Sequence, residues 1–567
     1  MDSSRPAAAP TPEAPSRWRS WAGALGLVAA LLWAAPEARG QSTDTVPAPR
    51  RAAATESVQA TDAAMAVLRA GGTAADGAIA AALVAGVTAP SSSGIGGGGF
   101  VLAWDAEKRA PFIIDFRETA PAGIDGDAFD RRPFPPEERG RLVGVPGEVH
   151  GLFELHRRAG KLRWADLVGR AERQARLGFV VGPHLANSLR YSSSALAGQP
   201  AFAALYYPGG TPAPVGTRIV NTRLAQTLAR LAAEGPAALS TGPIAAELVE
   251  VTRQHGGALT AADLAGYKTI ERTPLHTRWE GYDIYTMPLP SAGGLMLSQL
   301  LRLFSADELR RLGHGTPAYQ HLIAEGMRGA IADRMRHLGD PDFVDVDVEA
   351  LLDPRRMAER RRKIALDRTH TLPRFGLEEH GTHHLVTSDR NGNVVALTTT
   401  VNRGFGAKLM GEQSGVVLND ELNDFTALED VEPFGMTASP NRARPGARPV
   451  SSMTPTLVVQ RGQPVLALGG SGGPTIATNV TQLTLAALVF GQEPAEAVAA
   501  PRIYIPTRGK TLLVEEGTSA EHIADLEWRG EIVGTMPFKT TAVQMLRFDR
   551  GTQAGADPRK HGAAKVE

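Results

Sequence analysis

A change of pattern at residue 382 constrains the fold of this chain more than any other feature of its sequence. Residues 150–360 mostly show the spacing of helices, whereas the residues after 382 form short apolar runs that alternate with turns. A polar stretch at 362–381 separates the two parts and is predicted to be a loose surface segment. This order of elements predicts a layered α+β architecture, with sheets in the middle and helices packed outside.

Apolar periodicity and turn residues place the individual elements, and residues 41–55, which are polar and rich in Ala and Pro, are predicted to be a loose terminus. The predicted helices are Glu56–Ala70, Ala74–Thr88, Leu162–Leu177, Thr222–Ala233, Ile244–Gln254, Ala318–Arg336, Thr475–Val489 and Pro494–Ala499. The predicted strands are Phe100–Asp105, Pro111–Phe116, His383–Ser388, Val394–Val401, Val416–Leu418, Thr456–Gln460, Val465–Leu468, Arg502–Ile505, Thr511–Val514 and Ala542–Phe548.

Composition excludes several classes of partner and site. The chain carries 60 basic and 60 acidic residues, so its formal net charge is zero. Because binding to nucleic acids and anionic membranes depends on clustered positive charge, neither partner is expected. The chain contains no cysteine, which excludes disulfides, thiolate metal sites and a cysteine nucleophile.

The N-terminus has the pattern of a secretory signal peptide. Basic residues precede an apolar run at Trp21–Ala35, and the small residues Ala38 and Gly40 form a cleavage pattern before Gln41. The apolar run is shorter than the ~20 residues that a membrane-spanning helix needs. We therefore predict a signal peptide at residues 1–40, a periplasmic or secreted location and no stable membrane anchor; a retained N-terminal anchor is the alternative.

Two glycine-rich segments match well-known motifs. Gly94–Gly99 contains a formal G-x-G-x-x-G, but a helix precedes it and a strand follows it, which is the reverse of a dinucleotide-binding site. Gly469–Gly473 is formally G-x-S-x-G between a strand and a helix, and Asp525 and His561 follow it in the order of an α/β-hydrolase triad. The earlier parallel βα units of that fold are missing, so Ser471 is the weaker candidate for a nucleophile.

Gly381 and Thr382 have the layout that self-cleavage of the backbone needs. A hydroxyl residue begins a predicted strand directly after a glycine, whose lack of a side chain leaves its carbonyl open to attack. Cleavage would make Thr382 a new N-terminus, and its α-amine, with a pKa near ~8, would serve as general base for its own hydroxyl. Because a threonine after a glycine often only begins a strand, the motif alone decides nothing.

The turn after Thr382 determines which residue lies opposite it. If Asn391 and Gly392 formed a two-residue loop, Thr382 would pair with Val401. If the loop had three residues with Gly392 in the left-handed region, Thr382 would pair with Thr400, and Asn402 would lie diagonally on the same face. We favour the second register because it groups three polar side chains at one strand end.

Residues 56–562 resemble the gamma-glutamyltranspeptidase family of N-terminal-nucleophile hydrolases. Nine stretches match in sequence order: Asp115–Pro121, Gly144–Gly147, Pro290–Gly294, Gly339–Pro341, Thr382–His384, Asn419–Phe425, Arg448–Met453, Gly472–Gly473 and Asp557–Arg559. The resemblance implies a four-layer αββα sandwich. It also implies autocleavage into a large chain, residues 41–381, and a small chain, residues 382–567, which remain together as a heterodimer.

The resemblance implies that Thr382 is the nucleophile and that Thr400 supplies a hydroxyl that assists both it and the cleavage. Gly472 and Gly473 would donate backbone N–H groups to the oxyanion, which suits their place between a predicted strand and a predicted helix.

Six further residues would bind the substrate. A guanidinium suits a carboxylate, and a buried ammonium needs carboxylate partners. The resemblance assigns the α-carboxylate to Arg117, Ser451 and Ser452, and the α-ammonium to Asn402, Glu421 and Asp424. Without the resemblance, Arg117 would be interpreted as part of a surface ion pair.

The implied activity is cleavage of the γ-glutamyl amide bond of glutathione and related compounds, with transfer to water, amino acids or peptides and with no cofactor or metal. A glutaryl- or cephalosporin-type acylase on the same fold and an uncleaved γ-glutamyl-binding protein are the alternatives.

The chain departs from the family at three positions. His383 stands where many members have a second threonine, and Glu421 stands in place of an amide. Phe434 replaces a common tyrosine in Thr426–Val450, the segment that corresponds to a lid over the pocket. The lid change leaves the balance between hydrolysis and transfer open.

Overall fold

The structure, a computed structural model, describes residues 49–370, 381–505, 511–536 and 541–567. The predicted signal peptide and residues 371–380 of the predicted loose segment lie outside the described residues. Among the helices of the described part, none is both long and apolar enough to cross a membrane.

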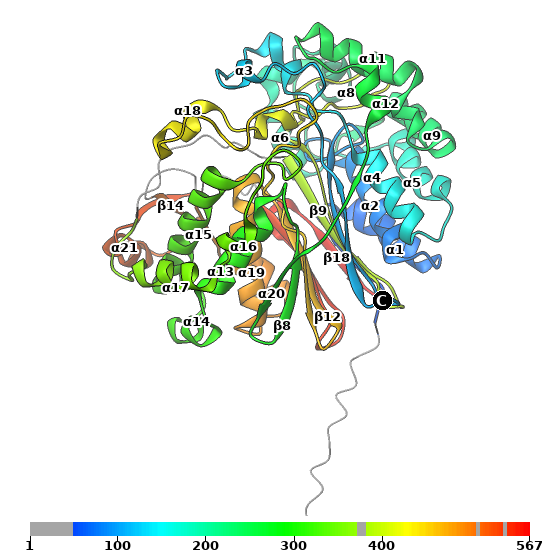
Figure 1. Cartoon of the computed structure of the whole chain (residues 1–567). Helices are drawn as coiled ribbons and strands as arrows, with labels where there is room; N and C mark the ends of the chain where they lie inside the picture. Colours follow the sequence, from blue (N-terminus) through cyan, green and yellow to red (C-terminus); the bar gives the residue numbers. More distant parts are fainter. Residues whose placement is uncertain (1–48, 371–380, 506–510, 537–540) are drawn as a thin grey trace, which may run out of the picture. The chain divides into compact units, whose positions relative to one another are not determined.

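Two antiparallel sheets pack face to face in the middle of the structure, with β9 and β10 against β12 and β16 (Figure 1). In spatial order, the first sheet consists of β18 (Ala563–Val566), β1 (Ala52–Thr55), β9 (Gly381–Ser388), β10 (Val394–Asn402), β2 (Gly98–Asp105), β3 (Ala110–Phe116) and β6 (Ile270–Arg272). The second consists of β17 (Gln553–Ala556), β16 (Ala542–Arg547), β12 (Gln463–Ser471), β11 (Thr456–Gln460), β8 (Tyr282–Thr286) and β7 (Leu275–Trp279).

A layer of helices covers the outer face of each sheet, which confirms the predicted αββα sandwich (Figure 1). The layer on the first sheet contains α1 (Val58–Arg69), α2 (Ala74–Thr88), α4 (Glu148–Ala159), α5 (Trp164–Leu177) and α9 (Thr222–Glu234). The layer on the second sheet contains α13 (Ala292–Leu303), α15 (Pro317–His337) and α19 (Ile476–Leu488). Helix α2 is buried on nearly every side, because its alanines let α1, α5 and β9 approach closely.

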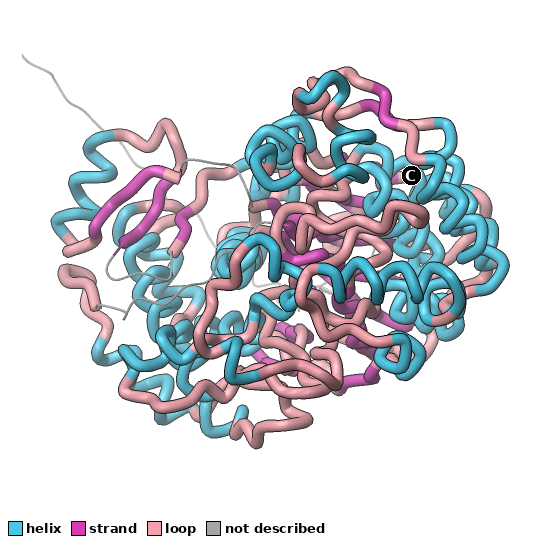
Figure 2. Tube along the Cα trace, turned by 90° about the horizontal axis from the view of Figure 1, so that it is seen from above, coloured by secondary structure: helices cyan, strands magenta, loops and turns pink. Residues whose placement is uncertain are grey.

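Most of the remaining predicted elements are present, with ends that differ by a few residues. They include α11 (Gly242–Gln254) and α20 (Pro494–Ala499). A small third sheet contains β13 (Ile503–Tyr504), β14 (Thr511–Val514) and β15 (Ile532–Thr535). Together with α21 (Ala520–Trp528) it lies at the edge of the sandwich (Figure 2).

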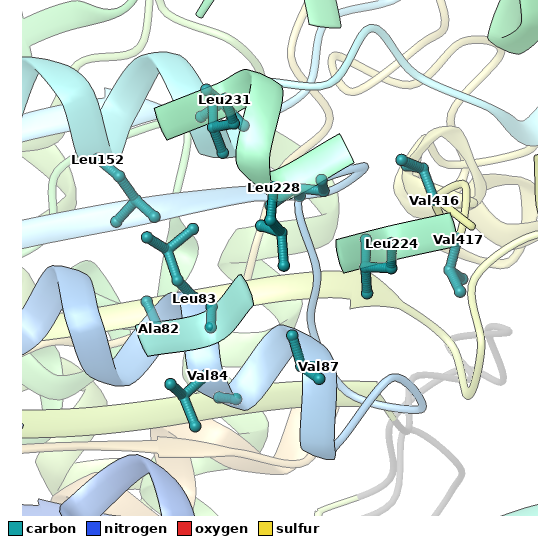
Figure 3. Close-up of a cluster of buried hydrophobic side chains, with 14 of the residues drawn as sticks. Ala82, Leu83, Val84, Val87, Leu152, Leu224, Leu228, Leu231, Val416 and Val417 are labelled. Atoms are coloured by element: carbon teal, nitrogen blue, oxygen red, sulfur yellow. The ribbon is translucent and has the colours of Figure 1, made fainter. Parts of the chain in front are cut away.

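The predicted strand Val416–Leu418 is wrong. The segment is irregular, and only an isolated bridge joins Met410 to Val417. The side chains of Val416 and Val417 lie beside Leu224 of α9 in the apolar core of the first helical layer (Figure 3). Periodicity cannot distinguish a short apolar run in a buried loop from one in a strand.

The prediction of a loose terminus at residues 41–55 is wrong at its end, where β1 lies between β9 and β18 with every residue buried. Strands β7 and β8 lie within residues 150–360, where the sequence predicts mostly helices, and they were not predicted. Three alanines and a threonine, covered on both faces, show no alternation of apolar and polar residues, so the sequence of β1 resembles a helix or a linker.

Two helical glycines provide a test of the packing between α4 and β3. A Cβ at Gly151 would lie 2.1 Å from Cγ of Phe116, whereas a Cβ at Gly169 of α5 meets nothing within 4 Å. G151A should lower the free energy of unfolding by about 1–3 kcal/mol through overpacking. G169A should raise it by about 0.5–1 kcal/mol, because Ala is the better helix former. Urea midpoints measure both effects, and a shift in the same direction for both would contradict this packing.

Candidate active site

Thr382 and Thr400 lie opposite each other at one end of the β9–β10 hairpin. Strand pairing aligns Thr382 with Thr400. The ladder ends at the Ser388–Val394 pair, and the Asp389 N–H then donates to the Asn393 carbonyl at 3.1 Å. Three residues, Arg390–Gly392, remain in the loop, and Gly392 has a φ of 85°. The predicted three-residue loop is therefore confirmed, and with it the register that groups the two hydroxyls.

The Thr400 hydroxyl connects the Thr382 side chain to the peptide bond before it. Its Oγ1 donates to the Gly381 carbonyl oxygen at 2.7 Å and accepts from the Asn402 N–H at 2.8 Å. The two threonine Oγ1 atoms are 3.2 Å apart. Because a hydroxyl has one hydrogen and that of Thr400 is used on Gly381, Thr382 is the donor in this contact. The Thr382 proton thus points at Thr400.

Asn402 joins the hairpin to the acidic segment η3 (Glu421–Asp424). A bulge after Thr400 places Asn402 opposite Gly381, and its φ of 73° is in the left-handed region, which Asn tolerates better than most residues. The Asn402 amide donates to the Asp424 carboxylate at 3.2 Å and to the Asp420 carbonyl at 3.1 Å. The predicted diagonal position is thus replaced by a bulge that still aims this side chain at Asp424.

Arg117 forms a buried ion-pair cluster at the end of β3. Its guanidinium pairs with Glu421 and, at 2.6 Å, with Asp424, and all three side chains are 1% exposed. Its Nε donates to the Pro449 carbonyl at 3.1 Å. The surface interpretation of Arg117 is therefore wrong. The structure brings the residue expected for a carboxylate into contact with the two expected for an ammonium.

Glu118 adds a second carboxyl group beside Glu421. Burial raises the pKa of Glu118 to about 8, against the opposing effect of the Arg117 charge. A carboxyl group with this pKa is mostly protonated, and therefore mostly neutral, at neutral pH.

Ser451 and Ser452 follow Pro449 and Val450 in an irregular segment. The Ser451 hydroxyl accepts from the Met453 N–H at 3.1 Å, and the Ser452 hydroxyl accepts from Arg334. Because Arg117 binds the Pro449 carbonyl, the serines lie close to the arginine with which they are expected to act.

Asn441 fixes the base of the segment expected to act as a lid. Its Nδ2 donates to the Asp424 carbonyl at 2.7 Å and its Oδ1 accepts from the Val450 N–H at 2.9 Å. Phe434 lies farther along, with the Arg336 guanidinium 5.6 Å from its ring centre. One amide thus holds both ends of the segment beside the acidic residues.

Gly472 and Gly473 form the turn between β12 and α19, with φ values of 116° and 61°. Ser471, just before them, is linked to the nucleophile strand through Lys560. The Lys560 ammonium donates to Ser471 Oγ at 2.7 Å and to the Thr382 carbonyl at 3.0 Å. It also pairs with Glu56 at 3.0 Å. Lys560 therefore connects Ser471, the residue directly before the two glycines, to Thr382.

The α/β-hydrolase alternative does not fit this geometry. Strand β12 pairs antiparallel with β11 and β16 rather than in a parallel sheet. Ser471 contacts Lys560, His561 is exposed, and Asp525 forms an ion pair with Arg529 on α21. These residues do not form a triad.

Sequence reasoning missed several residues of the site. Lys560 carries no local signal of its role and Glu56 is predicted only as the first residue of a helix, although the matched stretch Asp557–Arg559 ends directly before Lys560. Arg334 gave no signal beyond its helix. Among the residues that the structure describes, no group of three or more His, Cys, Asp or Glu could hold a metal ion.

Comparisons with known proteins identify the family of the chain. The family model described as Gamma-glutamyltranspeptidase matches residues 60–567. The chain is 34% identical to the glutathione hydrolase proenzyme of Bacillus subtilis over 88% of both proteins. It is 33% identical to the proenzyme of the same name from Escherichia coli over 87% of both.

Solved structures give a similar result. Cephalosporin acylase from Bacillus halodurans matches 92% of this chain and 96% of its own, with a TM-score of 0.81 and 26% identity. Helicobacter pylori gamma-glutamyltranspeptidase matches 55% of this chain and 90% of its own, with a TM-score of 0.52 and 29% identity. The chain belongs to the gamma-glutamyltranspeptidase family.

Proposed function

We propose that this chain is a self-processing threonine enzyme that cleaves the γ-glutamyl amide bond of glutathione and related compounds. The γ-glutamyl group passes to water, to amino acids or to peptides. The observation that carries the proposal is the Thr400 hydroxyl, which contacts both the Thr382 hydroxyl and the carbonyl of the bond before it. The names of the relatives, glutathione hydrolase proenzymes, support the substrate and the processing.

The hydrogen bonds supply a proton path for self-cleavage. The Thr382 oxygen bonds to the Gly381 carbonyl carbon while its proton passes to Thr400 and the Thr400 proton passes to the carbonyl oxygen. Collapse of this tetrahedral species returns a proton to the nitrogen, breaks the C–N bond and leaves an ester. Water then hydrolyses the ester to a Gly381 carboxylate and a free Thr382 amine. The products are the large chain, residues 41–381, and the small chain, residues 382–567.

In turnover the new α-amine, with a pKa near ~8, takes the proton of its own hydroxyl. Thr382 attacks the γ-carbonyl of the donor, and the N–H groups of Gly472 and Gly473 stabilise the oxyanion. The leaving amine takes the proton, and a γ-glutamyl ester remains on Thr382. Water or an acceptor amine then attacks this ester and releases Thr382.

The buried charges favour an α-amino acid head over a plain glutaryl group. Arg117 has the guanidinium fork that suits the α-carboxylate, and Glu421 and Asp424 are buried carboxylates that suit the α-ammonium. The likeness to a cephalosporin acylase keeps acylase activity as the second candidate. If the donor has no ammonium, Glu421 and Asp424 stay buried with Arg117 as their shared cation. Burial of these two carboxylates becomes costly once Arg117 also binds the donor carboxylate.

Export is part of the proposal. The basic residues, short apolar run and small-residue cleavage pattern within residues 1–40 support removal of a signal peptide and a periplasmic or secreted enzyme.

Thr382→Ala tests the nucleophile. The variant should remain a single chain and show no γ-glutamyl anilide turnover, whereas wild type should yield two fragments, one of which begins at Thr382. Intact mass and N-terminal sequencing measure the outcome. T382S keeps a hydroxyl and should still cleave, more slowly. Cleavage of T382A into two fragments, or a wild type that remains a single chain, would contradict the proposal.

Thr400→Val tests the proton path. Valine keeps the shape of Thr400 but removes the donor to the Gly381 carbonyl, so cleavage should slow by about 10²–10³-fold, as for loss of an oxyanion donor. The disappearance of the precursor with time gives the rate. T400S keeps the hydroxyl and serves as the control; equal rates for T400V and wild type would remove Thr400 from the mechanism.

Asp424→Asn tests recognition of the ammonium. Removal of one partner from a buried ion pair costs about 3–5 kcal/mol, so kcat/KM for a γ-glutamyl anilide should fall on the order of a hundredfold or more. A glutaryl anilide, which lacks the ammonium, should change little. Equal losses on both donors would contradict the role of Asp424, and a wild type that prefers the glutaryl donor would favour the acylase.

A further inference from the structure

Arg334 lies behind the segment that contains Ser451 and Ser452. It belongs to the last turn of α15 and is 7% exposed. Its guanidinium donates to the Ser452 hydroxyl, to the Ser451 carbonyl at 3.4 Å and to the Val450 carbonyl at 3.1 Å. One side chain thus contacts three consecutive residues.

The segment from 447 to 455 has no strand partners except the isolated bridge between Ser451 and Ser291. Neighbouring groups therefore fix its shape: the Ser451 N–H donates to the Pro290 carbonyl at 2.8 Å, and the Ser451 carbonyl accepts from the Ala292 N–H at 2.8 Å. Arg334 is the charged member of this set. A planar fork that binds several acceptors at once fixes their relative positions better than separate donors do.

The direction of the hydrogen bonds leaves both serine hydroxyls able to donate. Ser452 Oγ accepts from Arg334, and Ser451 Oγ accepts from the Met453 N–H. A hydroxyl has one O–H in addition to its lone pairs, and neither O–H is used in these contacts. A hydroxyl that accepts from a charged donor also becomes a stronger donor itself. The arrangement suits a carboxylate, which only accepts.

We propose that Arg334 is a positioning residue for the α-carboxylate of the donor: it holds the Ser452 hydroxyl and the backbone at 450–451 so that Ser451 and Ser452 donate to that carboxylate. Arg334 itself does not touch the substrate. The proposal rests on the proposed function, since it requires a donor with an α-carboxylate.

Three anilide donors separate this role from general damage to the fold. The γ-glutamyl anilide has both head groups, the glutaryl anilide keeps only the carboxylate, and the 4-aminobutanoyl anilide keeps only the ammonium. R334K should lower kcat/KM about tenfold or more on the two donors with a carboxylate, mainly through KM, as for loss of hydrogen bonds to a charged group. It should change less than about twofold on the 4-aminobutanoyl donor, which lacks the group concerned.

Two further variants control the experiment. R302K changes an arginine of α13 that donates to the Leu352 carbonyl at 2.8 Å, and it should leave all three donors unaffected. S452A removes the hydroxyl that Arg334 holds and should reproduce the R334K pattern. R334Q removes the same guanidinium and replaces R334K in the test if that variant fails to fold. Intact mass of each variant reports whether cleavage has occurred.

The outcomes distinguish the two proposals. Equal losses on all three donors, or none, would overturn the positioning role of Arg334. If wild type discriminates against the 4-aminobutanoyl donor and S452A loses this preference while R334K keeps it, only the role of Arg334 fails. If wild type itself shows no preference for a donor with an α-carboxylate, the proposed function fails and the role of Arg334 fails with it.

Discussion

The antiparallel pairing of β9 with β10 is the constraint on which the rest of the site depends. It places the Thr400 hydroxyl 2.7 Å from the Gly381 carbonyl oxygen and 3.2 Å from the Thr382 hydroxyl. A slip by one residue would turn Thr400 to the other face of the sheet and separate these groups. The Gly392 turn and the burial of both strands between a helical layer and the second sheet leave no other register.

Charge balance links this hairpin to the binding residues. From Thr400, contacts run through Asn402 to Asp424 and from there to Arg117. Arg117 neutralises carboxylates that would otherwise be costly to bury, and protonation of Glu118 removes a further charge. An amino acid head has one charge of each sign, so it can replace the internal pairing without any change in the net charge buried. A head with a single charge cannot do so.

Local rules were enough for the hairpin but not for its surroundings. The turn chemistry of Gly392 and the polar strand ends predicted the register, and the order of elements predicted the layers. Strand β1 was not predicted because its sequence, Ala-Ala-Ala-Thr, shows no alternation. Val416 was assigned to a strand because a buried loop is as apolar as a strand. Lys560 and Arg334 act through tertiary contacts with residues 178 and 118 positions away, which no local spacing encodes.

The place of β1 has a consequence for the two chains expected after cleavage. Strand β1, from the segment before residue 382, lies between β9 and β18, which come from the segment after it. In the second sheet, β8 and β11 join the two segments in the same way. Each of the two sheets would therefore contain strands from both cleavage products. The two chains could not separate without unfolding both sheets, and they could not exchange with the chains of another copy. Each enzyme molecule would therefore keep the pair of chains from its own precursor.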